Sequence, residues 1–192
     1  LYFKDALRTW NKLVQLYPED PSAQEAQLNI GRLYFQGRQY DNAVKAFDVL
    51  LKTWPRTALA VEAQWMMAQS YYNFKKYNEA ISVYESFLRA HPKDSRLENC
   101  KEQLMLAYYN RAVSTKDPRF LSHFVQAYPQ STLAAEAQYM LGFVAYTGQD
   151  WAAAVTQMRQ LLLNYPGTSQ APTALLAIAR ALEHLKDTDS AI

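Results

Sequence analysis

Small, aromatic and apolar residues recur along the chain at a fixed interval of 37 residues. The interval is clearest in the five prolines Pro18, Pro55, Pro92, Pro129 and Pro166, of which four follow Tyr or Trp and one follows His. A fixed period of this length indicates a solenoid, in which each repeat buries its apolar face against its neighbours. We therefore expect the chain to offer an extended surface rather than a pocket.

Each repeat contains two segments with helical periodicity. In the second repeat, the first segment has Met67, then the small residue Ala68, then Tyr71, and a small residue at that position lets two helices approach closely. The second segment places Ala80, Tyr84 and Phe87 at the i, i+4, i+7 spacing of an amphipathic helix. Proline then closes the repeat, because it lacks a donor and disfavours helix in the residue before it. No segment alternates with period 2, so the pattern predicts an all-α fold of helix A, turn and helix B.

The period divides the chain into a single array over 1–192. The expected units are 1–17 as helix B of a preceding repeat, full repeats at 18–54, 55–91, 92–128 and 129–165, and a partial repeat at 166–192. Because the array starts and stops within a repeat, we expect the chain to be a piece of a longer protein.

The third repeat departs from the others. Met105 occupies the small-residue position of helix A, and Asp117-Pro118 stands where helix B should begin with alanine. Aspartate before proline is typical of a helix N-cap followed by the first helical turn, as at Asp20-Pro21. Helix B of this repeat is therefore predicted to begin late, near Pro118.

These positions resemble the tetratricopeptide repeat family. In the second repeat the matching residues are Met67, Ala68, Tyr71, Ala80, Tyr84 and Pro92. The resemblance implies a right-handed α-solenoid of antiparallel helix pairs, a TPR superhelix, with helix A lining a concave face. It also implies a non-catalytic scaffold that holds protein partners.

The link between repeats is longer than usual for this family. It runs Tyr-Pro-x-Ser-x-x-Ala-x-x-Ala from Tyr128 to Ala137, and is similar to bacterial cell-envelope members of the family. Two examples are the outer-membrane lipoprotein of the β-barrel assembly machinery and the periplasmic coordinator associated with Tol-Pal. The resemblance implies a periplasmic, outer-membrane-associated scaffold.

Helix A carries the candidate binding residues. Aromatic side chains with polar tips favour recognition, because they bring large contact areas with few torsions to restrict. The candidates on the concave face are Trp65, Tyr72, Tyr109, Tyr139, Phe143, Tyr146, Arg32, Phe35 and Gln69. We expect them to receive an extended or helical segment of a protein partner. The alternative is that many of these rings pack against the next repeat.

Charge and composition exclude several kinds of partner and site. The 20 Lys and Arg nearly balance the 18 Asp and Glu, without a run of five like charges, so no nucleic-acid partner is expected. No apolar stretch approaches the roughly 20 residues of a membrane span, and a membrane anchor would lie outside this sequence. The single cysteine, Cys100, occupies an alanine position of the repeat and is expected to be a small buried residue.

Three histidines, His91, His123 and His184, lie in different repeats without metal-ligand spacing. We therefore expect no catalytic residue, no metal site and no cofactor, and hence no enzyme. The leading interpretation is an envelope scaffold. One alternative is a cytoplasmic adaptor or secretion chaperone, and another is a targeting module attached to a larger enzyme.

Overall fold

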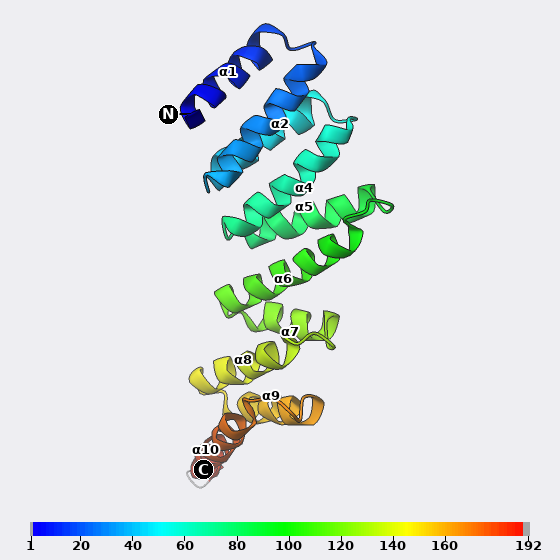
Figure 1. Ribbon diagram of the computed structural model, residues 1–192. Coiled ribbons are helices and arrows are strands. Elements are labelled where there is room, and N and C mark those ends of the chain that lie inside the picture. Colours follow the sequence, from blue (N-terminus) through cyan, green and yellow to red (C-terminus); the bar gives the residue numbers. More distant parts are fainter. Residues whose placement is uncertain (1, 190–192) are drawn as a thin grey trace. The chain divides into compact units, whose positions relative to one another are not determined.

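The computed structural model describes residues 2–189, with side chains placed over 2–186, and this range holds ten α-helices and no strand (Figure 1). Helices of the A type are α2 (Pro21–Gln36), α4 (Ala58–Asn73), α6 (Leu97–Thr115), α8 (Ala134–Thr147) and α10 (Ala171–Asp189). Helices of the B type are α1 (Tyr2–Leu16), α3 (Tyr40–Thr53), α5 (Tyr77–Ala90), α7 (Pro118–Ala127) and α9 (Trp151–Asn164). The predicted all-α fold of antiparallel helix pairs is confirmed.

The chain divides into two compact units, Leu1–Ala107 and Tyr108–Ile192. In the first unit α1 packs on α2, α2 on α3, α3 on α4 and α4 on α5. In the second unit α7 packs on α8, α8 on α9 and α9 on α10. Each of these helices therefore packs against its sequence neighbours within its unit, as the period predicts. The single array over 1–192 stays a prediction.

The small residues of helix A let the two helices of a repeat approach closely. Gly31 and Gly142 are both buried, and a Cβ atom added at either position would overlap the facing helix B. The overlap falls on the Phe47 ring in the first case and on the Met158 side chain in the second. The expectation that a small residue here lets the two helices approach closely is confirmed at Gly31 and Gly142. Cys100 is also fully buried, and burial raises the pKa of its thiol to about 11.

In the link before each A-type helix, a side-chain oxygen accepts a hydrogen bond from the backbone. The side-chain oxygens of Asp20, Thr57, Asp94, Ser131 and Thr168 accept hydrogen bonds from the backbone N–H groups of Ser22, Ala60, Arg96, Leu133 and Gln170. At α2 and α4 the donors lie in the first turn of the helix, where helical partners are lacking. Before α6, α8 and α10 the donor is the residue immediately ahead of the helix, so the contact orders the end of the link.

The turn between helix A and helix B uses a residue in the left-handed region. Arg38, Lys75 and Gln149 have φ values of 57°, 61° and 61°, and each follows a helix C-cap at Gly37, Phe74 or Gly148. This conformation lets the Arg38 N–H bond the Phe35 carbonyl oxygen at 2.9 Å and satisfies the helix end.

The third repeat is irregular, as expected. Its helix A, α6, has 19 residues, and the left-handed residue Lys116 follows its end. Helix α7 then begins at Pro118, with Asp117 accepting a hydrogen bond of 2.9 Å from the Arg119 N–H. The late start of helix B and both aspartate caps, Asp20 and Asp117, are confirmed.

Candidate protein-binding face

Three of the candidate aromatic residues pack across the turn of their own repeat. Phe35, Tyr72 and Tyr146 each meet, edge to face, the first residue of the following helix B. The ring centroids lie 5.6 Å from Tyr40, 5.8 Å from Tyr77 and 5.2 Å from Trp151, respectively. These rings are half-buried, so part of each supports the helix pair and part faces solvent.

Tyr109 has a different neighbour. The third repeat has no aromatic residue at the matching turn position, and the Tyr109 ring lies 5.3 Å from that of Phe124, which is fully buried. Burial, together with a hydrogen bond to Glu136, raises the pKa of the Tyr109 hydroxyl above its ordinary value. Tyr109 therefore belongs to the packing of the second unit as much as to its surface.

In the first unit the candidates on α2 and α4 are largely occupied by contacts within the chain. The Arg32 guanidinium pairs with Glu62 of the next A-type helix and also donates to Asn29 at 3.1 Å. The Trp65 ring lies 5.7 Å from both Tyr84 and Phe87, two buried rings of α5. Gln69 and Trp65 are half-buried. The surface here is filled by its own side chains.

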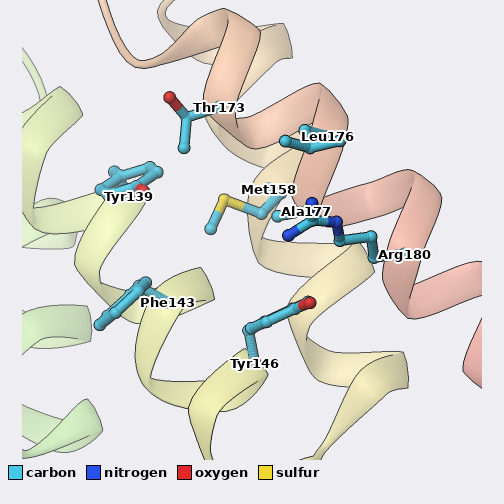
Figure 2. A pocket seen from close by; sticks show the side chains of 8 residues that line it. All are labelled: Tyr139, Phe143, Tyr146, Met158, Thr173, Leu176, Ala177 and Arg180. Atoms are coloured by element: carbon cyan, nitrogen blue, oxygen red, sulfur yellow. The ribbon is translucent and has the colours of Figure 1, made fainter.

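In the second unit three candidates line one pocket, with a volume of about 150 Å³ (Figure 2). Tyr139, Phe143 and Tyr146 lie on α8, and the Tyr139 and Phe143 rings stack at a centroid distance of 6.2 Å. The rest of the lining comes from Met158 of α9 and from Thr173, Leu176, Ala177 and Arg180 of α10. Met158 is 1% exposed, whereas Phe143 is 45% exposed. The pocket is a correction to the expectation of a surface without pockets.

The structure thus brings together Tyr139, Phe143 and Tyr146, and places the other candidates elsewhere within the two units. Five lining residues were not among the candidates: Met158, Thr173, Leu176, Ala177 and Arg180. The repeat register contained a signal for Met158, which faces the small residue of helix A, and for Leu176 and Arg180, which share the repeat positions of Tyr139 and Phe143. Thr173 and Ala177 follow only from the packing of α10 beside α8.

Comparison with family models identifies the repeat. A model described as tetratricopeptide repeat matches residues 3–58, 28–95 and 139–192, which is more than half of the chain. The chain belongs to the tetratricopeptide repeat family. Repeats of this kind form protein-binding surfaces rather than catalytic centres. A second model, described as outer membrane lipoprotein (YfiO), matches residues 62–150. The comparison with curated proteins gives no match.

Several solved structures are similar to the chain. MamA from Desulfovibrio magneticus RS-1 is 22% identical, with a TM-score of 0.48 and coverage of 87% of this chain and 88% of that one. BtubC from P. vanneervenii is 15% identical, with a TM-score of 0.45 and coverage of 96% and 83%. The TPR2AB domain of yeast Sti1, in a complex with pHSP90, is 14% identical, with a TM-score of 0.44 and coverage of 98% and 80%.

Two kinds of feature are not found in the part of the chain that the structure describes. None of its helices combines the length and apolar character that crossing a membrane requires. No group of three or more His, Cys, Asp or Glu side chains is arranged to hold a metal ion.

Proposed function

We propose that the protein is a non-catalytic scaffold that organises a complex of the bacterial cell envelope by binding other proteins through its A-type helices. The observation that carries protein binding is the apolar pocket on α8 and α10, in which the Phe143 ring is exposed beside the half-buried rings of Tyr139 and Tyr146. Exposed apolar surface with a polar rim is typical of interaction sites.

The envelope location is supported by the match of residues 62–150 to the outer membrane lipoprotein model. The same match favours a periplasmic, outer-membrane-associated scaffold over a cytoplasmic adaptor. The candidates on the A-type helices of each unit are proposed to contact the partner, with a peptide or helical segment as ligand.

Site-specific photo-crosslinking in the source cells tests the proposal. A benzophenone side chain at Phe143 is expected to give crosslinks to proteins of the envelope fraction. The matched control is the same side chain at Leu163, which lies on α9 outside the pocket and is 79% exposed. A protein found entirely in the cytoplasmic fraction, or equal crosslinking from both positions, would contradict the proposal.

A further inference from the structure

The pocket on α8 and α10 has a counterpart three repeats earlier, on α2 and α4. In the 37-residue register, Phe143 and Thr173 take the positions of Arg32 and Glu62. The two sites therefore occupy equivalent repeat positions with different side chains, so we compare the residues at these positions.

In the first site a salt bridge links the two A-type helices. Arg32 and Glu62 form an ion pair from α2 to α4, and both side chains are partly buried. In the second site Phe143 and Thr173 cannot form such a pair, and the pocket lies between them. The second site thus has an apolar pocket at the positions where the first site has a partly exposed ion pair.

The pocket contains a single charged lining residue, Arg180. Figure 2 shows it reaching from α10 on the side of the pocket where Tyr146 also lies. Its counterpart in the first site is the neutral Gln69. Among the described side chains, Arg180 forms no ion pair, in contrast to Arg32. A guanidinium beside an apolar surface pairs strongly with a carboxylate once a ligand excludes water.

We propose that this pocket binds one phenylalanine-sized apolar side chain from an acidic segment of the partner protein, whose carboxylate pairs with Arg180. The inference rests on the proposed scaffold function and specifies its ligand. The volume of about 150 Å³ supports the size, because an apolar cavity of about that volume accommodates a benzene ring. The sole positive lining charge supports the acidic flank.

Three short blocked peptides of otherwise equal sequence test the ligand, with Asp-Phe-Asp, Lys-Phe-Lys or Asp-Ala-Asp at the centre. Binding to the 192-residue chain is followed by fluorescence anisotropy and by the NMR signal of the ¹³C-labelled Met158 methyl group in the pocket. The Asp-Phe-Asp peptide is expected to shift the Met158 signal and to bind about tenfold more tightly than either other peptide. Equal binding of all three, or an unchanged Met158 signal, would overturn the inference.

Two sets of variants separate charge from shape. The parent chain is expected to prefer the Asp-Phe-Asp peptide over the Lys-Phe-Lys peptide. Arg180→Glu is expected to reverse this preference. Arg180→Gln, which copies Gln69, is expected to abolish it, so that both peptides bind equally. The matched control is Arg159→Glu, the same charge change at an exposed position of α9. If Arg159→Glu alters the preference as much as Arg180→Glu, a local role for Arg180 is wrong.

The double variant Phe143→Arg, Thr173→Glu transfers the ion pair of the first site into the pocket. It is expected to melt like the parent chain and to lose binding of the Asp-Phe-Asp peptide. Retained binding would place the peptide elsewhere and overturn the inference. Failure of the peptides while Phe143 still crosslinks to envelope proteins would overturn the ligand assignment alone, and leave the scaffold function in place.

Discussion

Gly31 of α2 lies directly against the ring of Phe47 of α3. A Cβ atom at Gly31 would come within 2.6 Å of Phe47 Cδ1 and 2.7 Å of Cζ. Phe47 is fully buried in the core of the first unit, so its ring has no free space to move into. The two helices of this repeat can therefore approach this closely only because Gly31 has no side chain.

Replacing this glycine by alanine is expected to destabilise the protein. Gly31→Ala should lower the free energy of unfolding by about 2–3 kcal/mol, since overpacking outweighs the gain in helix propensity. Gly142→Ala should have a smaller effect, about 1 kcal/mol, because its added methyl group meets the flexible Met158 side chain, 2.8 Å from Sδ. Urea unfolding measures both. Gly167→Ala, with no atom within 4 Å of the added group, is the control, and equal effects of the first two changes would contradict the prediction.

Removing the buried hydroxyl group of Tyr84 is expected to stabilise the protein. Tyr84 is fully buried, and its hydroxyl has no hydrogen-bond partner among the described residues, while the matching position in the preceding repeat is Phe47. Tyr84→Phe should raise the free energy of unfolding by about 1 kcal/mol, because it removes an unsatisfied polar group. Tyr165→Phe is the matched control. It removes a bond of 3.3 Å to the Pro129 carbonyl oxygen, so thermal unfolding should show a slight loss instead. A loss at both positions would disprove the explanation.

Asp94 predicts a pH dependence of stability. Its hydrogen bonds with the Arg96 side chain, at 2.7 Å and 2.8 Å, lower the pKa of the carboxyl group from 3.8 to about 2. Because the folded pKa is depressed, this stabilisation is present above about pH 4 and is lost as the pH falls toward 2. The ion pair contributes at most about 2 kcal/mol to the free energy of unfolding, since solvent reaches both side chains: Asp94 is 15% exposed and Arg96 is 29% exposed.

The measurement is chemical unfolding of Asp94→Asn and of the parent chain at several pH values. Asp94→Asn should be less stable at pH 7, and the difference should shrink as the pH is lowered below 4. Glu98→Gln removes an exposed pair with Lys101 and should change little at any pH. A difference that stays constant down to pH 2 would rule out the ionised Asp94 as its cause.

Replacing the left-handed turn residue Lys75 by glycine is a second change that is expected to stabilise the protein. Lys75 has a φ of 61°, which glycine adopts without the steric strain of a Cβ atom. Lys75→Gly should therefore raise the free energy of unfolding by about 0.5–1 kcal/mol. Phe74→Gly is the neighbouring control. Phe74 has a φ of −80°, so glycine there gains no relief and should destabilise. Thermal unfolding of both variants checks the ordering, and the opposite ordering would contradict it.

Much of the fold could be predicted from the sequence. The period of 37 residues, the small positions such as Gly31 and the cap at Asp117 are local or strictly repeating features, which depend on single residues and their immediate neighbours. The late start of α7 followed from the same local chemistry. Buried polar residues were not foreseen. The Gln27 side chain, 6% exposed, donates to the Ala46 carbonyl oxygen at 2.8 Å, and Gln138 makes the equivalent bond to Gln157 at 3.0 Å.

The sequence by itself determined the helix pairs, their order and the family, because each depends on spacing along the chain. Only the tertiary structure decided which candidate rings are available to a partner. Phe35 and Trp65 rest against other rings, while Phe143 stands exposed beside a pocket. The physical reason is that exposure depends on what the facing helix presents. Arg32 pairs with a carboxylate on the next A-type helix, whereas Phe143 lies across the pocket from Thr173, and no property of either residue alone distinguishes an occupied site from an open one.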